Sequence, residues 1–211
     1  MKSQNGYKSS SSGHADSTPQ AQADHVGENI PERVIFMNEI CNASSLSPMD
    51  LCAVESAARN NPNSTILVTT LRVAAGSQLN VTESMKAVMA ENSNIRIHVV
   101  HSLHSLAKGT PIEHWLKEHD ITSATFNATV RARASAVGNL LKYLELYNFG
   151  GSILDLDTVT IKPLEDKFLN TAPFEPPALV NTGILFFSKR HKIMEHMLHA
   201  FPSWLVLEQM I

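Results

Sequence analysis

Two aspartates, Asp155 and Asp157, form a D-x-D pair that directly follows a short apolar run. That run is itself preceded by Gly150 and Gly151, a pair of residues typical of a helix end. Carboxylates at the end of a buried strand are poorly placed to be structural, and hard oxygen ligands of this kind bind Mg²⁺ or Mn²⁺. The pair therefore predicts a divalent cation site.

A cation held there suits a reaction in which a nucleoside diphosphate leaves a sugar. Negative charge develops on that leaving group, and a metal ion that bridges its phosphates stabilises the charge. With the i, i+2 spacing, one carboxylate can bind the metal while the other binds the ribose or a metal-bound water. A loop with two solvated acids is the simpler alternative, because a bare D-x-D is a weak motif.

Phosphohydrolases that form an aspartyl phosphate are a competing class. They also place D-x-D-x-T/V after an apolar strand, and residues 153–159 partly fit that pattern. Those enzymes complete the metal site with acids well downstream. Here Asp166 is the only aspartate after Asp157. The acidic pair Glu165-Asp166 follows the D-x-D pair too closely for another strand to lie between the two pairs. The phosphohydrolase class also gives no reason for the Gly-Gly pair, so a phosphohydrolase is the weaker interpretation.

The segments around the pair alternate between short apolar runs and helical patterns. We expect strands over 33–37, 65–70, 95–100 and 152–155, and helices over 48–59, 82–90, 111–118 and 128–148. Ser47 caps the first helix, and Thr110 forms a capping box with Glu113. Such alternation predicts an α/β sandwich with a parallel sheet, in which ligands bind beyond the carboxyl ends of the strands.

Composition limits the classes of protein. The chain of 211 residues, 43% of them hydrophobic, suits one domain with a sizeable core. The polar, low-complexity start, with a serine tract over 9–12, predicts a disordered segment over 1–30 and leaves one domain over 31–211. The net charge of −3 and the absence of a basic stripe exclude nucleic acid as the expected partner.

The two cysteines and the sequons bear on the cellular compartment. Cys41 and Cys52 are either two buried thiols or, as we predict, a disulfide that closes a short loop. Four Asn-x-Ser/Thr sequons favour a secretory lumen; they begin at Asn42, Asn63, Asn80 and Asn127. No signal peptide or membrane span is recognisable in the chain.

Four segments, taken together, resemble the α-1,4-glycosyltransferase family. Residues 52–62 are similar to its C-S-V-E-S-A-A-R-x-x-P helix, and residues 110–115 to its T-P-L-x-x-W turn. Residues 148–157 are similar to its G-G-I-Y-L-D-x-D segment, and residues 181–187 to the strand near the donor sugar. The order and spacing of all four agree, over roughly residues 34–204, which makes the resemblance far more specific than D-x-D alone.

The resemblance implies a GT-A-type nucleotide-sugar-binding α/β/α sandwich, truncated at its C-terminal side. It implies a UDP-sugar donor of galactose or N-acetylglucosamine, a glycolipid or glycan acceptor, Mn²⁺ (or Mg²⁺), retention at the anomeric carbon and an α-1,4 linkage. It also implies a type II membrane glycoprotein of the Golgi, with membrane association expected only for a full-length form.

The resemblance also assigns roles to residues. Asp155 and Asp157 would bind the metal, and no residue is assigned as catalytic. The residues expected to bind the donor come from the long helix, the Gly-Gly turn and the segments after it: Asn139, Lys142, Gly150, Gly151, Asp155, Asn181 and Gly183.

The sequence departs from the family at two of these positions. Asn139 and Lys142 stand where the family's S-D-x-x-R has Asp and Arg. Arg presents a planar fork of donors and Lys only a point charge, so donor contacts should weaken or change. Trp204 is the last match to the family, which continues further. A catalytically inactive or truncated member that acts as a binding remnant is therefore the alternative function.

The C-terminal residues 201–211 are mostly large and apolar. We expect Pro202 to break the preceding helix. We also expect the apolar tail that follows to leave a surface exposed to water.

Overall fold

The structure, a computed structural model, describes residues 30–40, 45–71, 80–119, 121, 130–164, 169–176 and 179–208. The segment predicted to be disordered, apart from Ile30, lies outside the described residues.

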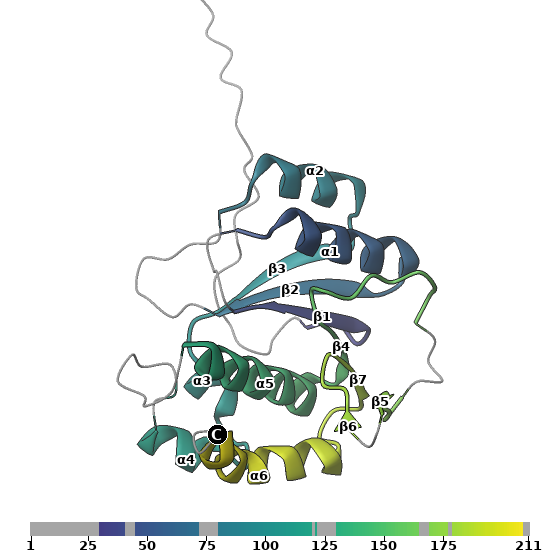
Figure 1. Cartoon of the computed structure of the whole chain (residues 1–211). Coiled ribbons are helices and arrows are strands. Elements are labelled where there is room, and N and C mark those ends of the chain that lie inside the picture. Colours follow the sequence, from purple (N-terminus) through teal and green to yellow (C-terminus); the bar gives the residue numbers. More distant parts are fainter. Residues whose placement is uncertain are drawn as a thin grey trace, which may run out of the picture.

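A five-stranded sheet with the order β3-β2-β1-β4-β7 forms the centre of the molecule (Figure 1). The strands β1 (Val34–Glu39), β2 (Thr65–Leu71), β3 (Ile95–Val100) and β4 (Gly151–Leu154) pair in parallel. At the other edge β7 (Ile184–Phe187) pairs with β4 in the antiparallel direction. The parallel sheet predicted from the alternating pattern is confirmed. The short strands β5 (Phe174–Glu175) and β6 (Leu179–Val180) form a separate antiparallel pair.

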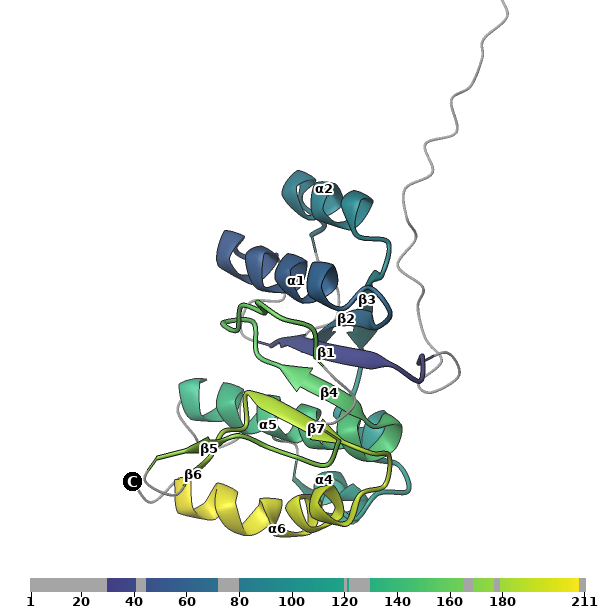
Figure 2. The ribbon, with the colours of Figure 1, turned by 90° about the vertical axis from the view of Figure 1, so that its right-hand side faces the viewer.

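Helices cover both faces of the sheet, which makes a three-layer sandwich (Figures 1 and 2). One face carries α1 (Pro48–Asn60) and α2 (Glu83–Glu91). The other face carries the long helix α5 (Val130–Phe149) and, beyond it, α4 (Glu113–Glu118) and α6 (Lys192–Glu208). The short helix α3 (Leu103–Ala107) lies beside α5.

Each face of the sheet buries its own apolar core, because side chains alternate along a strand. In β1, Val34 and Phe36 belong to the core beneath α5, while Ile35 and Met37 belong to the core beneath α1. The same alternation places Asn38, the next residue of β1, on the α5 side. A polar residue thus follows the apolar ones near the carboxyl end of the central strand.

Helix ends follow the predicted signals in most places. The Ser47 hydroxyl accepts a hydrogen bond from Asp50 N, and the Asp50 carboxylate accepts one from Ser47 N at 2.7 Å. Thr82 caps α2 in a similar way through Met85 N. The long helix ends at Gly150, whose φ of 73° is the left-handed conformation that glycine tolerates.

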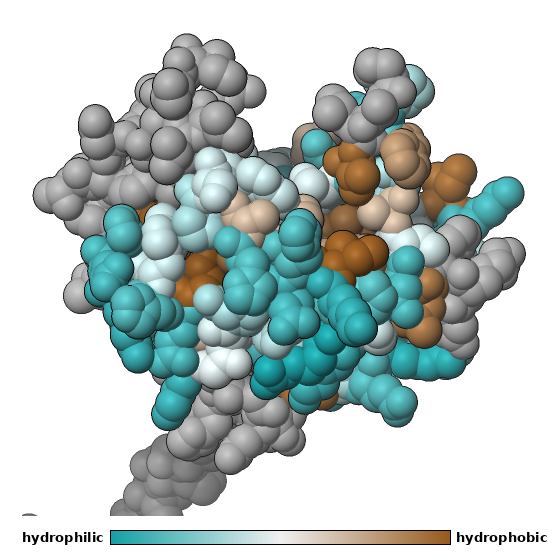
Figure 3. Space-filling model, turned by 90° about the horizontal axis from the view of Figure 1, so that it is seen from below, coloured by the Kyte–Doolittle hydropathy of each residue, from teal (hydrophilic) through white to brown (hydrophobic). Residues whose placement is uncertain are grey.

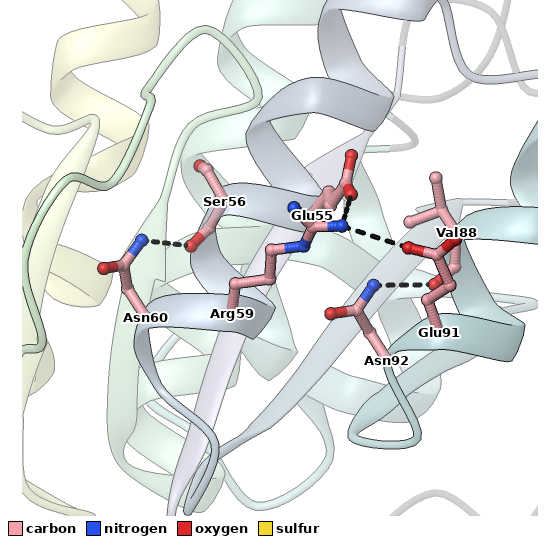
Figure 4. Close-up of polar contacts among 7 residues, drawn as sticks. All are labelled: Glu55, Ser56, Arg59, Asn60, Val88, Glu91 and Asn92. Carbon is pink, nitrogen blue, oxygen red and sulfur yellow. Dashed lines mark hydrogen bonds and ion pairs between the residues drawn. The ribbon is translucent and has the colours of Figure 1, made fainter.

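The outer helices α1 and α2 are joined by a polar cluster on their solvent side (Figure 4). The Arg59 guanidinium lies 2.7 Å from Glu55 on its own helix and 3.0 Å from Glu91 on α2. The Asn92 amide, just after α2, donates to the Val88 carbonyl oxygen at 2.8 Å. Because these ion pairs are exposed, they contribute little to stability, and the apolar contacts beneath them hold the layer.

The predicted capping box at Thr110 is wrong. The Thr110 hydroxyl donates to the Ala107 carbonyl oxygen at 2.6 Å, and the Glu113 carboxylate accepts from Gly109 N at 2.7 Å. Helix α4 begins two residues later than expected for a Thr110 cap, and its N-cap, Ile112, has no side-chain cap. The two polar side chains close the turn after α3 instead, because its backbone groups are nearer to them.

The prediction that Pro202 breaks the last helix is also wrong. Helix α6 runs through Pro202 to Glu208. Met194, Leu198 and Phe201 are fully or almost fully buried along one side of α6, and Phe201 packs edge-on against Trp115. Proline removes one backbone donor from the helix, and this buried apolar face compensates for that loss.

The predicted disulfide is contradicted. Cys52 is exposed and its thiol is free, so it is neither bridged nor buried. Cys41 lies outside the described residues. Position 52 falls on the solvent side of α1, away from the residues of that helix that contact the sheet, which include Ala53, Val54 and Ala57.

The face formed by α4 and α6 is largely hydrophilic, with hydrophobic residues gathered on one side of it (Figure 3). Trp204 on α6 is 37% exposed and meets Tyr143 edge-on. The side chains from 205 onward lie outside the described part, so the exposed apolar tail stays a prediction. Within the described residues, the structure has no helix with the length and apolar character of a membrane span.

Candidate functional site

Asp155 leaves the carboxyl end of β4 between two neighbouring strands, β1 and β7. Its backbone N–H donates to the Gly183 carbonyl oxygen at 2.8 Å, which extends the β4–β7 ladder by one residue. Its own carbonyl oxygen accepts from Thr158 N at 2.9 Å and closes a turn. The backbone on both sides of Asp155 is thereby fixed, and its carboxylate is half-buried at the sheet edge where ligands bind in parallel α/β folds.

Lys142 reaches this carboxylate from α5. Its Nζ lies 2.6 Å from Asp155 Oδ1 and also donates to the Thr182 carbonyl oxygen at 3.4 Å. The lysine side chain is only 10% exposed. A charge this far from water requires a partner, so the ion pair fixes the positions of both groups.

The loop from Asn181 to Gly183 forms the opposite wall. The Asn181 side-chain oxygen accepts from Gly183 N at 2.7 Å, an Asx-type turn that Asn adopts readily. Asn181 N donates to the Pro173 carbonyl oxygen, which ties the loop to the β5–β6 pair. A β-carbon at position 183 would lie 2.8 Å from Asp155 Oδ2, so a larger residue there would displace the carboxylate or the loop. The structure thus brings together four of the predicted donor-site residues, Lys142, Asp155, Asn181 and Gly183.

Two further predicted residues lie near this group without bonding to it. Asp157 is exposed, two residues beyond Asp155. Asn139 is half-buried on α5, one turn before Lys142. In the described part of the chain its side chain has no hydrogen bond to the four residues above. The roles of both residues stay predictions.

Gly150 and Gly151 lie at the other end of β4 from Asp155. A β-carbon at Gly150 would lie 2.6 Å from Lys189 N, and one at Gly151 would lie 2.6 Å from the Val34 carbonyl oxygen. Both residues have positive φ, 73° and 106°. The contacts described for these glycines are therefore with the protein's own backbone, and their predicted part in donor binding stays a prediction.

Sequence reasoning missed a buried acid next to this site. Glu145, on α5, is 1% exposed, and its Oε2 accepts from the Asn38 amide at 2.7 Å. Burial raises the pKa of the Glu145 carboxyl from 4.5 to about 8, although Asn38, Thr69 and the Lys142 charge lower it. The neighbouring leucines Leu141, Leu144 and Leu146 are all buried, but an apolar neighbourhood in the sequence does not by itself distinguish a buried acid from an exposed one.

The site supplies the kind of ligands that a divalent cation requires. Within the described residues no group of three or more His, Cys, Asp or Glu side chains is placed to hold a metal. Mg²⁺ is commonly held by one or two carboxylates together with water and substrate phosphates. Asp155 and Asp157 supply two such carboxylates, and the absent side chain of Gly183 leaves Asp155 Oδ2 uncovered on that side; a cation shared with a diphosphate there stays a prediction.

Comparison with known proteins adds independent findings. The model of the family described as "glycosyltransferase sugar-binding region containing DXD motif" matches residues 47–175, more than half of the chain. Lactosylceramide 4-alpha-galactosyltransferase from Mus musculus is 26% identical over 169 residues, which cover 80% of this chain and 45% of that protein. The Homo sapiens protein of the same name is 25% identical over 160 residues, 76% of this chain and 43% of that protein. The chain spans less than half the length of these relatives.

Solved structures agree on the fold. The PaToxG glycosyltransferase superposes with a TM-score of 0.58 at 19% identity, over 83% of this chain and 62% of that one. A transferase with two cysteine-to-serine substitutions superposes with a TM-score of 0.51 at 10% identity, over 87% of this chain and 84% of that one. The expected GT-A-type α/β fold is confirmed.

Proposed function

Since the chain belongs to the family of glycosyltransferases whose sugar-binding region contains the DXD motif, we propose that it transfers a hexose from a UDP-sugar. The hexose is galactose or N-acetylglucosamine, and it passes to a glycolipid or glycan acceptor in α-1,4 linkage, with retention at the anomeric carbon. The names of the matched relatives support galactose and a lactose-bearing lipid. The family resemblance and the sequons support the Golgi lumen as the place of action.

One observation carries the proposal: Lys142 and Gly183 lie against the carboxylate of Asp155, and Asn181 holds the turn at Gly183. These residues come from a helix, a loop and a strand end that are far apart in the sequence. Local folding requirements of α5 or β4 do not call for a half-buried ion pair, whereas a site for a charged ligand does. The carboxylate, the ammonium and the close-packed glycine match the parts that a nucleotide-sugar site needs.

The residues then have distinct tasks. Asp155 and Asp157 hold the cation, Lys142 orients the Asp155 carboxylate until the cation binds, and the Asn181–Gly183 turn lines the sugar pocket. When bound, Mn²⁺ or Mg²⁺ would neutralise the charge that develops on the departing UDP. The backbone of Asp155, fixed by its hydrogen bonds to Gly183 and Thr158, keeps the reorganisation of the site small during transfer.

Calorimetry with UDP-galactose and UDP-N-acetylglucosamine, with and without Mn²⁺, tests donor binding. We expect binding that requires Mn²⁺ and that Asp157→Ala weakens strongly. Glu118→Ala, which removes an exposed acid on α4, serves as the control and should bind as the wild type does. Absence of binding by the wild type, or equal binding by Asp157→Ala, would contradict the proposal.

A binding module without turnover is the second candidate. The observation in its favour is that the Lys142 ammonium occupies Asp155 Oδ1, one of the oxygens that a cation would use. This candidate predicts a folded chain that binds UDP-sugar and transfers none of it. Detectable transfer to a lactose-type acceptor would exclude this candidate.

A further inference from the structure

Glu145 is a buried acid to which the proposed function gives no task. It lies on the side of α5 that faces the sheet, where Asn38 of β1 and Thr69 of β2 are register partners. Asn38 donates to one of its oxygens, Oε2. Among the described residues, Glu145 Oε1, Asn38 Oδ1 and Thr69 Oγ1 are buried without a well-directed hydrogen bond. The Thr69 hydroxyl lies close enough to lower the pKa of the Glu145 carboxyl, but no well-directed bond satisfies Glu145 Oε1, which can therefore accept from a further donor.

The nearest cationic donor on the same helix is Lys142. Positions 142 and 145 are three residues apart, a spacing that places side chains on the same face of a helix. The Lys142 charge already acts on the Glu145 carboxyl. In the structure the ammonium is 2.6 Å from Asp155 Oδ1, on the solvent side of the site. One ammonium therefore lies near two carboxyl groups, one half-exposed and one buried.

A cation bound at Asp155 creates a conflict for Lys142. The ammonium and the metal would compete for the same carboxylate, and their like charges would repel each other at short range. The lysine side chain is only 10% exposed, so an ammonium displaced from Asp155 without a new partner would be buried and unpaired. The flexible stem of lysine allows the charge to move while the helix stays in place.

We propose that Glu145 is a positioning residue that acts through Lys142: its free oxygen receives the Lys142 ammonium when a divalent cation binds at Asp155. The inference rests on the proposed function, because it requires a cation at Asp155. It assigns to Glu145 the task of keeping Lys142 inside the site, next to the donor, in the metal-bound state. A purely structural Glu145 would support the packing of α5 and would have no dependence on Lys142.

A double-mutant cycle on Mn²⁺ binding, measured by calorimetry with the whole chain and saturating UDP, tests this dependence. The cycle compares the wild type, Glu145→Gln, Lys142→Met and the double variant. We expect Glu145→Gln to weaken Mn²⁺ binding by about tenfold or more, since the displaced ammonium then meets a neutral amide oxygen instead of a carboxyl group that can ionise beside it. In the Lys142→Met background the same change should have no effect. An equal effect in both backgrounds would overturn the inference.

The environment of Lys142 gives a second readout. With ¹³C-labelled lysine, the Cε resonance of Lys142 is identified by its absence from Lys142→Met. Adding Mg²⁺ and UDP should leave that resonance at a buried position in the wild type and move it to the position of solvent-exposed lysines in Glu145→Gln. An identical shift in both proteins would contradict the inference. If the wild type binds no Mn²⁺ at all, the proposed function fails as well, whereas normal binding with no coupling refutes the Glu145 role alone.

Discussion

Gly183 lies so close to Asp155 that a β-carbon at position 183 would be 2.8 Å from Asp155 Oδ2. The same glycine accepts the Asp155 backbone hydrogen bond through its carbonyl oxygen. The ladder hydrogen bond therefore fixes the backbone of Asp155, and the absence of a side chain at Gly183 makes room for its carboxylate. In a Gly183→Ala protein the carboxylate or the loop must shift.

We expect Gly183→Ala to lower the affinity for UDP-sugar by about tenfold or more while the protein remains folded. Calorimetry of donor binding measures the effect. Gly109→Ala is the control for backbone strain away from the site: a β-carbon there would contact nothing within 4 Å, but φ is 73°, so this variant should lose stability and keep the donor affinity of the wild type. Unchanged affinity in Gly183→Ala would show that the position of the Asp155 carboxylate does not matter.

We expect Gly151→Ala to lower the stability of the fold. At this position φ is 106°, and a β-carbon would lie 2.6 Å from the Val34 carbonyl oxygen of the central strand. Strained backbone and a backbone clash together should cost about 2 kcal/mol or more of unfolding free energy. Urea denaturation followed by circular dichroism measures it. A loss below about 0.5 kcal/mol, the range of neutral surface changes, would be inconsistent with this packing.

The buried Glu145 makes stability depend on pH. Because burial raises its pKa from 4.5 to about 8, the folded protein keeps a proton that the unfolded chain releases between these values. The stability from this group is fully present below about pH 4.5 and is lost as pH rises through about 8. Glu145→Gln stays neutral, so its melting temperature should rise relative to that of the wild type between about pH 5 and about pH 9.

Thermal melts at a series of pH values for both proteins test this prediction. Glu118→Gln, an exposed acid on α4, should follow the wild type at every pH. Parallel curves for Glu145→Gln and the wild type would mean that Glu145 is ionised in the folded protein.

Cys52 should react with thiol reagents in the folded protein. Its thiol is free and exposed on α1. Maleimide labelling without reductant, followed by peptide mass spectrometry, should find Cys52 modified. Protection of Cys52 that disappears after reduction would instead restore the disulfide predicted from the sequence.

Local patterns were sufficient to predict the parallel part of the sheet. Apolar runs between helix caps gave β1, β2, β3 and β4, because burial and capping depend on neighbouring residues. The capping box predicted at Thr110 shows the limit of such local rules. The residue types and spacing fit the motif, but both side chains bond to backbone groups of the preceding turn instead.

Long-range features could not be predicted locally. The antiparallel direction of β7 and its bond to Asp155 depend on chain segments that meet only after folding. The D-x-D pair was visible in the sequence, and the resemblance supplied Lys142, Asn181 and Gly183. Glu145 was missed because an acid in a helix normally faces water, and only the packing of α5 shows that it does not.

Transfer of labelled galactose or N-acetylglucosamine from its UDP-sugar to a lactose-type acceptor, in the presence of Mn²⁺, is the most direct test of the proposed activity. We expect a labelled product from the wild type, an α-1,4 linkage in that product, and loss of activity in Asp155→Asn with the fold intact. A folded wild type that binds the donor and forms no product with either sugar would contradict the claim that this site is a working glycosyltransferase centre. Equal product from Asp155→Asn would contradict it as well.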